Sequence, residues 1–332
     1  MRAVVVGSTG FVGGHVRTGL ARRGWHVAAL DRSSLPDGDI VRALAGMIAV
    51  SPPDLVVNCT GATSGSRTAL YRSNADLARD LACAVAAAGR RPRLVHIGSA
   101  AEYGAASGSR PCAEVDEAIP LTDYGRSKLE GTRRVLAAVP SATVLRATTV
   151  IGAGCGGFVG AVCRQIAAGA PDGTVAVGSL AAARDLVDVD DLVAAVDSVA
   201  RAPAVHGGIY NVGTGVAVEL DLVVARVRAV TGFRGRVVTG RVPGSGRSAA
   251  VVSQCSDIGK IARDVGWAPV TPLDASIRAV WDQACASTRT HVDRGGRACP
   301  SHSSPVPTAG SAVPPRSGWP TAATTSSSPH GG

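Results

Sequence analysis

A tyrosine and a lysine stand one helical turn apart in the segment Tyr124-Gly125-Arg126-Ser127-Lys128. In a helix, residues at this spacing share a face, so the Lys128 ammonium would lie close to the Tyr124 phenol. A nearby cation favours the phenolate and lowers the pKa of a tyrosine from about 10 toward neutrality. Tyr124 could then donate a proton to a carbonyl or accept one from an alcohol. The alternative is that Tyr124 is an ordinary packing residue of an amphipathic helix.

A serine follows the apolar run 94–97 and Gly98. If that run is a buried strand, the Ser99 hydroxyl stands just beyond its carboxyl end and could hydrogen-bond a substrate oxygen near Tyr124. Serine at such a position is also typical of a helix cap. The pairing of Tyr124 with Lys128 favours the catalytic interpretation, so the candidate catalytic residues are Ser99, Tyr124 and Lys128.

The first apolar run of the chain ends in a glycine-rich segment, Gly7-Ser8-Thr9-Gly10-Phe11-Val12-Gly13. Glycine allows a tight turn and lets the backbone approach a pyrophosphate, and a helix that begins there offers free N–H groups to the phosphates. Asp31 ends the second apolar run, where its carboxylate could bind an adenosine ribose. The pattern predicts a dinucleotide site formed by Gly7, Thr9, Gly10, Phe11, Val12, Gly13, Asp31 and Arg32.

Two adjacent residues bear on the choice between NAD and NADP. The Asp31 carboxylate would repel a 2′-phosphate and favours NAD, whereas Arg32 could pair with that phosphate and favours NADP. The alternative for Arg32 is a solvated surface cation. The sequence therefore predicts NAD or NADP, with NAD slightly favoured.

Short β-branched runs alternate with amphipathic helical stretches through the first part of the chain, which is typical of successive βαβ units. The fold class predicted is α/β, a Rossmann-like doubly wound parallel sheet whose ligand crevice lies at the carboxyl ends of the strands. We expect strands at 2–6, 27–30, 55–58, 94–97 and 143–146, and helices at 11–23, 41–50, 74–88 and 124–139.

Shorter elements and glycine-rich turns follow residue 150. We therefore expect a dinucleotide-binding domain at 1–150 and a smaller C-terminal α/β substrate lobe at 151–285, which could exchange elements with the first domain. From 286 to 332 the chain is rich in Ser, Thr, Pro and Gly, a composition that cannot bury enough apolar surface to offset its ordering entropy. This segment is predicted to be a disordered tail.

Composition excludes several classes of function. The net charge is +9, but the basic residues are scattered, and aromatic residues make up only 3% of the 332 residues, so we expect no nucleic-acid partner. The apolar runs are too short to cross a bilayer, so we expect no membrane span. The eight cysteines form no CxxC pair and no metal-ligand spacing, and we see no secretory leader. We expect reduced thiols, no metal site and a cytoplasmic location.

Together the motifs resemble the extended short-chain dehydrogenase/reductases, also called the NAD-dependent epimerase/dehydratase family, most of which act on nucleotide-diphosphate sugars. The resemblance runs from residue 1 to about 284. Besides the glycine-rich turn and the Tyr124/Lys128 pair, it rests on Asn58-Cys59-Thr60-Gly61-Ala62, Asn74 opening a helix, Ser99 with Tyr103-Gly104, Arg184-Asp185-Leu186-Val187-Asp188-Val189-Asp190-Asp191, Tyr210-Asn211-Val212-Gly213 and Val265-Gly266-Trp267-Ala268-Pro269.

The resemblance implies further site residues. It implies that Lys128 orients the nicotinamide ribose and that Arg184 contacts a substrate diphosphate; a helix-flanking surface arginine is the alternative for Arg184. The implied cofactor-binding residues also include Asp39, Ile40, Cys59, Thr60, Gly61, Asn74, Tyr124, Lys128, Ala147 and Thr149. The implied substrate-binding residues are Ser99, Ala100, Ala101, Thr149 and Arg184.

The positions after Ser99 separate the family's reactions. Its 4,6-dehydratases carry Asp-Glu where this chain has Ala100 and Ala101, so the carboxylates for elimination are missing. The connection from Asp31 to Asp39-Ile40 is similar to dTDP-4-dehydrorhamnose reductases, and the segment 98–104 to GDP-4-keto-6-deoxymannose reductases. The resemblance thus implies NAD(P)H-dependent reduction of the C4 ketone of a nucleotide-diphosphate 4-keto-6-deoxyhexose, in deoxysugar and secondary-metabolite biosynthesis.

Three alternatives remain open. A 4-epimerase would use the same residues and retain its cofactor. The small residues at 147–149, where the family often has aromatics and an Asn, would suit a ketoreductase that acts on a non-sugar aglycone. A silent dinucleotide sensor is the alternative outside catalysis. The family also implies a homodimer, through a helical bundle that includes the helix 124–139.

Overall fold

The computed structural model describes residues 1–292, apart from 32, 34, 36–38, 89–91, 106–109, 170–172 and 241–250. The described residues all belong to one compact unit, Met1–Arg297. Arg32 and the part of the predicted tail from 293 to 332 lie outside the described residues.

Six parallel strands form the main sheet, in the order β2-β1-β3-β4-β5-β9. After β1 the chain crosses to β2 at one edge and then returns to place β3 on the other side of β1, which makes the carboxyl ends of β1 and β3 the topological switch point. The strands are β1 (Arg2–Val6), β2 (His26–Leu30), β3 (Leu55–Asn58), β4 (Arg93–Ser99), β5 (Thr143–Ala147) and β9 (Gly208–Val212).

Helices cover both faces of this sheet because its strands are apolar on both sides. In β1, Ala3 and Val5 pack in one hydrophobic cluster and Val4 and Val6 in another. The first cluster takes in α1 (Phe11–Arg22), α7 (Val189–Arg201) and α9 (Gly259–Val265); the second takes in α2 (Ile40–Val50), α4 (Leu77–Ala86) and α5 (Asp123–Ala138). The predicted doubly wound parallel sheet is confirmed.

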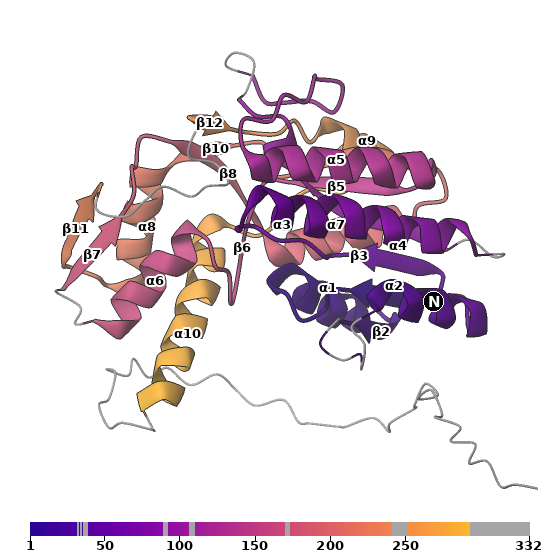
Figure 1. Cartoon of the computed structure of the whole chain (residues 1–332). Coiled ribbons are helices and arrows are strands. Elements are labelled where there is room, and N and C mark those ends of the chain that lie inside the picture. The colour runs from indigo at the N-terminus through magenta and orange to yellow at the C-terminus, as the bar shows by residue number, and fades with distance from the viewer. Residues whose placement is uncertain are drawn as a thin grey trace, which may run out of the picture. The chain divides into compact units, whose positions relative to one another are not determined.

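The remaining elements form a smaller α/β part with its own hydrophobic cluster. Figure 1 shows its helices gathered beside β7 and β11, away from α2 and α4. β9 lies in this later part of the sequence but completes the main sheet, so the two predicted regions share an element. The other members are β6 (Thr149–Ile151), α6 (Phe158–Ala168), β7 (Thr174–Val177), β8 (Ala183–Asp188), β10 (Ala217–Glu219), α8 (Leu220–Thr231), β11 (Arg236–Thr239), β12 (Ser253–Gln254) and α10 (Leu273–Val292).

Helix α10 continues past the predicted boundary at residue 285 and ends at Val292. The hydroxyls of Ser287 and Thr288 donate to the carbonyls of Gln283 and Ala284, one turn earlier, so these polar residues are accommodated within the helix. The low-complexity composition therefore starts inside the helix.

Three further properties are those of the described residues alone. None of the helices among them is long and apolar enough to span a membrane. No cluster of His, Cys, Asp or Glu side chains in the described ranges could hold a metal ion. The seven described cysteines are free thiols.

Candidate active site

The glycine-rich turn between β1 and α1 is packed against the loop that follows β3. Gly7 has φ +81°, and a Cβ there would lie 3.1 Å from the Thr60 backbone nitrogen. A Cβ on Gly13 would lie 2.1 Å from the Gly7 carbonyl oxygen, so only glycine lets α1 begin this close to the turn. Gly10 is the N-cap of α1 and has no side chain to accept from the first-turn N–H groups. An anion can take that place.

Asp31 leaves β2 and turns its carboxylate back onto the glycine-rich turn. The carboxylate accepts hydrogen bonds from the Ser8 hydroxyl, from the Thr9 backbone N–H at 2.9 Å and from the Thr9 hydroxyl at 3.1 Å. Burial alone would raise the pKa of Asp31, but these hydrogen bonds outweigh burial and the pKa is lowered. The turn is therefore bordered by an ionised carboxylate, as a ribose-binding site requires.

The loop after β3 is held by two asparagines. The Asn58 side-chain oxygen accepts from the backbone N–H and the hydroxyl of Thr60. Asn74 is fully buried; its side chain bonds to the N–H and the carbonyl of Ala62 and donates to the Ser127 hydroxyl. Asn74 thereby links the loop that carries Cys59, Thr60 and Gly61 to helix α5.

The prediction that Asn74 opens a helix is wrong. The helical segment begins with α3 (Arg67–Tyr71) and continues through η2 (Arg72–Asp76), a π-helical turn, into α4. Ser66, which caps α3 by accepting from the Ala69 N–H, marks the true start. Asn74 lies in the π turn, where its amide faces the Ala62 backbone; a direct contact with the cofactor stays a prediction.

Ser99 ends β4 and is also the N-cap of η3 (Ala100–Glu102), a short 3₁₀ helix. Its hydroxyl oxygen accepts from the Ala101 N–H at 3.2 Å, and the Glu102 carboxylate accepts from the Ser99 N–H at 2.9 Å. The two interpretations of Ser99 are therefore compatible, because capping uses the oxygen as an acceptor and leaves the hydroxyl hydrogen to be donated.

Helix α5 brings Tyr124 and Lys128 to the carboxyl end of β4. A Cβ on Gly125 would lie 2.4 Å from the Ala101 carbonyl oxygen, so the helix packs directly against η3. The buried Lys128 ammonium donates to the Ile97 carbonyl at 2.6 Å. Tyr124, one turn earlier on α5, is partly exposed. The structure thus gathers Ser99, Tyr124 and Lys128 at one end of the central strands.

Burial changes the titration of the groups around Lys128. It lowers the pKa of Lys128, and the charge of Glu102 partly opposes that shift. It raises the pKa of Cys59 to about 12, so this thiol is neutral. The pKa of His96, on β4, is held well below 6.5 by burial and by the Lys128 charge.

A buried polar network that the sequence did not predict lies behind Ser99. Glu102 is fully buried and accepts from Arg146 of β5 at 2.9 Å. The Arg146 guanidinium lies 4.5 Å from the centroid of the Tyr103 ring, and the Tyr103 hydroxyl donates to the Asn211 side-chain oxygen at 2.8 Å. The spacing Ser99-x-x-Glu102 is that of a capping box and was the one local signal of this network.

The remaining predicted cofactor contacts lie near the strand ends or at the start of α2. Asp39 caps α2 by accepting from the Arg42 N–H at 2.9 Å, and Ile40 is buried in the cluster under α2. Ala147 is the last residue of β5, and Thr149 begins β6. Their contacts with a cofactor stay predictions.

The predicted substrate contacts differ in exposure. Ala100 is buried beside Ser99, and Ala101 is partly exposed. The Arg184 guanidinium donates to the carbonyls of Ala183, Val251 and Val252, and burial lowers its pKa. A contact of Arg184 with a diphosphate stays a prediction.

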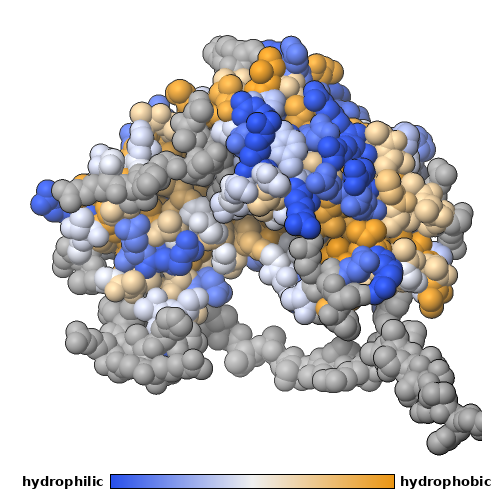
Figure 2. Space-filling view, in the orientation of Figure 1, coloured by the Kyte–Doolittle hydropathy of each residue, from blue (hydrophilic) through white to orange (hydrophobic). Residues whose placement is uncertain are grey.

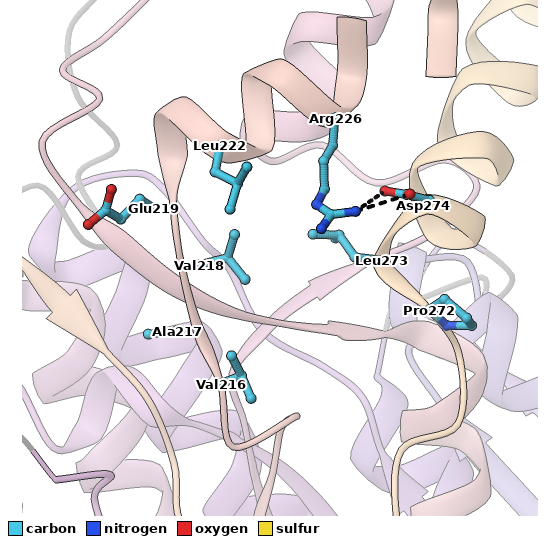
Figure 3. Close-up of a pocket in the computed structure, with 9 residues that line it drawn as sticks. All are labelled: Val216, Ala217, Val218, Glu219, Leu222, Arg226, Pro272, Leu273 and Asp274. Atoms are coloured by element: carbon cyan, nitrogen blue, oxygen red, sulfur yellow. Dashed lines mark hydrogen bonds and ion pairs between the residues drawn. The ribbon is translucent and has the colours of Figure 1, made fainter. Parts of the chain in front are cut away.

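A separate pocket of about 570 Å³ lies between β10, α8 and the start of α10 (Figure 3). Val216, Val218 and Leu222 give it an apolar wall, and an ion pair of 3.0 Å joins Arg226 to Asp274 beside them. No predicted catalytic or cofactor-binding residue lines this pocket. The strand ends, where the titratable groups converge, remain the candidate site.

Comparisons with known proteins agree with this geometry. Residues 3–213 match the model of the NAD dependent epimerase/dehydratase family. A dTDP-6-deoxy-L-talose 4-dehydrogenase (NAD(P)(+)) of Kitasatospora kifunensis is 32% identical over 304 residues, which are 84% of this chain and 94% of the relative. A probable dTDP-4,6-dihydroxy-2-methyloxan-3-one 4-ketoreductase of Streptomyces antibioticus is 31% identical over 71% of this chain and 80% of its own length.

The structure of MoeE5 in complex with UDP-glucose and NAD superposes with a TM-score of 0.74 at 26% identity, over 87% of this chain and all of that one. The predicted cofactor, NAD or NADP, is confirmed by the family, whose cofactor the glycine-rich turn and Asp31 fit. By its sequence, its fold and the residues at its strand ends, this chain belongs to the NAD dependent epimerase/dehydratase family.

Proposed function

We propose that this protein uses NADH or NADPH to reduce the C4 ketone of a dTDP-linked 4-keto-6-deoxyhexose. The observation that carries the proposal is the convergence of Tyr124 and Lys128 on the end of β4 that bears Ser99. The names of the relatives, a dTDP-sugar 4-dehydrogenase and a dTDP-sugar 4-ketoreductase, support the dTDP-linked substrate and the position of the ketone.

Each of the three residues has a distinct role in the proposed reaction. The Ser99 oxygen accepts from the Ala101 N–H, so the Ser99 hydrogen can be donated to the ketone oxygen. Tyr124 donates the proton that completes the alcohol, and the Lys128 charge stabilises the phenolate left behind. A bound nicotinamide dinucleotide would supply the hydride to C4.

The burial of Glu102 favours reduction over elimination of water. A dehydratase needs a carboxyl group that reaches the substrate, and Ala100 and Ala101 offer none. Glu102 is the next residue along, but it is completely buried and bound to Arg146, Thr132 and the Ser99 N–H. It therefore cannot exchange protons with a sugar.

The test is the stoichiometry of the cofactor. The purified protein is mixed with a dTDP-4-keto-6-deoxyhexose and with NADH or NADPH, and cofactor oxidation is compared with the amount of reduced sugar. We expect one cofactor oxidised per sugar. A protein that carries bound NAD and interconverts 4-epimers without external reductant would be an epimerase, and turnover of a non-sugar ketone alone would make it an aglycone ketoreductase; either result contradicts the proposal.

We also propose a homodimer that uses α3 and α5. Figure 2 shows hydrophilic side chains over the region where Figure 1 places these helices. Arg67 and Arg126 lie near Asp123, and Arg134 pairs with Asp76 and Glu130. These ion pairs lie within one chain and give this surface a polar character. Light scattering should give a dimer. A monomer contradicts the proposal.

The diphosphate contact proposed for Arg184 and the cytoplasmic location of the protein both rest on the sequence. A diphosphate contact predicts that Arg184→Met raises the KM for the nucleotide sugar and leaves the Kd of the dinucleotide unchanged. An unchanged KM contradicts it. The cytoplasmic location follows from the cysteine usage of the sequence and stays a prediction.

A further inference from the structure

Glu102 is a completely buried carboxylate with partners on three elements. One oxygen accepts from the Ser99 N–H at 2.9 Å and from the Thr132 hydroxyl of α5 at 3.1 Å. The other accepts from Arg146 of β5 at 2.9 Å. These charge-assisted and neutral hydrogen bonds tie the end of β4 to both β5 and α5.

Gly98 makes room for that carboxylate. A Cβ at position 98 would lie 2.9 Å from the nearer Glu102 oxygen and 2.9 Å from a methyl carbon of Val144. Any side chain at 98 would therefore push Glu102 away from the Ser99 N–H. The pair Gly98 and Glu102 acts as one structural unit beneath the catalytic serine.

The Lys128 ammonium binds the same stretch of β4. It donates to the Ile97 carbonyl at 2.6 Å, and Ile97 and Ser99 flank Gly98. The carboxylate of Glu102 and the ammonium of Lys128 thus hold adjacent peptide groups of one strand end. The charge of Glu102 opposes the lowering of the Lys128 pKa that burial causes.

We propose that Glu102 is a positioning residue of the active site: it fixes the Ser99 backbone and supplies the negative charge that keeps the buried Lys128 ammonium protonated. The assignment of catalysis to Ser99 and Lys128 rests on the proposed function. The effect of the Glu102 charge on Lys128 does not depend on the proposed function and can be measured without cofactor or substrate.

The other groups around Lys128 cannot supply that charge. Burial raises the pKa of Cys59, after β3, to about 12, so its thiol is neutral. His96, on β4, is also neutral because its pKa is held well below 6.5. Tyr124, on α5, is the residue whose phenolate Lys128 is proposed to stabilise. Arg146, on β5, carries a positive charge. Glu102 is the described anion whose charge raises the pKa of Lys128 against the effect of burial.

The titration of Lys128 can be measured directly because Lys128 and Lys260 are the only lysines of the chain. Protein grown with lysine labelled with ¹³C at Cε gives two side-chain signals, which a Lys260→Arg variant assigns. Lys260 is an internal control: it donates to the Ile209 carbonyl and lies 4.3 Å from the centroid of the Tyr210 ring. The titration midpoints of both lysines are compared in the wild type, Glu102→Gln and Glu130→Gln.

Glu130→Gln is the matched control, because Glu130 also pairs with an arginine, Arg134 at 2.7 Å, on the same helix as Lys128. We expect Glu102→Gln to lower the Lys128 midpoint by at least about one pH unit and leave Lys260 unchanged. Glu130→Gln should move neither. An unchanged Lys128 midpoint in a folded Glu102→Gln protein would overturn the proposal, whatever the substrate proves to be.

One further variant separates the anchoring of Ser99 by Glu102 from the effect of the Glu102 charge on Lys128. A second keeps the measurement possible if Glu102→Gln does not fold. Glu102→Asp keeps the charge but is shorter, so it should preserve the Lys128 midpoint while lowering kcat more than it raises KM. If kcat is unchanged, the anchoring of Ser99 is refuted. The double variant Glu102→Gln with Arg146→Met removes both buried charges and should fold even if Glu102→Gln does not. It too should lower the Lys128 midpoint, and an unchanged midpoint would count against Glu102.

Discussion

The proposed crevice has a buried carboxylate at each end, and the two are held differently. Asp31, at the end proposed to bind adenosine, accepts from hydroxyl and N–H donors of Ser8 and Thr9 in the glycine-rich turn. Glu102, beside the proposed catalytic residues, is bound by Arg146, Thr132 and the Ser99 N–H, which come from three elements. Asp31 is slightly exposed at 7%, whereas Glu102 is sealed at 0%.

The difference indicates two uses of a negative charge. Asp31 borders the surface of the turn, so its charge can act directly on a ligand and discriminate between a ribose hydroxyl and a phosphate. Glu102 cannot touch a ligand, so its charge acts through Lys128 and its geometry through Ser99. Removing Arg146, the ion-pair partner of Glu102, should therefore destabilise the protein. Changing Asp31 should mainly alter which dinucleotide is preferred.

The largest effect is expected from Arg146→Met. This change leaves the Glu102 carboxylate buried without its ion-pair partner and should lower the free energy of unfolding by about 3–5 kcal/mol. Chemical denaturation measures it. Arg134→Met is the control, because its ion pairs with Asp76 and Glu130 are partly exposed and should contribute at most about 1 kcal/mol. An equal decrease in the free energy of unfolding of the two variants would show that the buried and the surface ion pairs contribute alike.

Tyr124→Phe should lower kcat at least about 100-fold, because it removes the proton donor. The Kd for the dinucleotide, measured by fluorescence or calorimetry, should stay close to that of the wild type, since little cofactor-binding surface is lost. A variant with near-normal turnover would show that the proton comes from another group.

At the other end of the crevice, Asp31→Ala should weaken the use of NADH and improve that of NADPH. The lost hydrogen bonds to a charged acceptor correspond to about 1.5–3 kcal/mol, or roughly tenfold to a hundredfold in kcat/KM. Arg32→Ala should leave NADH use unchanged. If the wild type prefers NADPH by more than about tenfold and Arg32→Ala abolishes that preference, Arg32 and not Asp31 selects the cofactor.

The smallest effect concerns His96, which lies between the two ends on β4. Neither ring nitrogen has a hydrogen-bond partner among the described residues, and the pKa is held well below 6.5 by burial and by Lys128. The folded state keeps His96 neutral while the unfolded state takes up a proton below about pH 6.5, so stability should fall by about 1.4 kcal/mol for each pH unit below that value.

His96→Leu should remove that part of the slope, whereas His26→Ala, at an exposed site, should not. Denaturation midpoints between about pH 5 and 7 measure both, above the range in which the carboxylates titrate. A slope that persists in His96→Leu would mean that another group takes up the proton.

Local patterns predicted the fold well, while the roles proposed for the site residues stay predictions. The observed strands at Arg2–Val6 and Leu55–Asn58 match the expected ranges, because a fully buried parallel strand appears as a continuous apolar run. The glycine-rich turn and the Tyr124/Lys128 pair were visible because each depends on the spacing within a single element. The helix start predicted at Asn74 was wrong, since Asn74 lies in a π turn, which has no simple periodic signal.

The buried network could not be predicted in the same way. Arg146 meets Glu102 across forty-four positions of sequence, and Asn211 meets Tyr103 across one hundred and eight. Neither contact has a local pattern, because each forms only when β5 pairs with β4 and β9 pairs with β5 in the sheet. The predicted domain boundary at 150 and the homodimer likewise depend on contacts that the sequence does not encode locally.

The most direct test of the central claim is to follow the transferred hydride. The protein is supplied with nicotinamide dinucleotide deuterated at the reactive position and with a dTDP-4-keto-6-deoxyhexose, and the sugar product is analysed by mass spectrometry and NMR. We expect one deuterium per product molecule, at C4. Tyr124→Phe should form product more slowly, with the deuterium at the same position, because Tyr124 supplies only the proton. A product without deuterium at C4, formed while the labelled cofactor is left intact, would contradict the central claim.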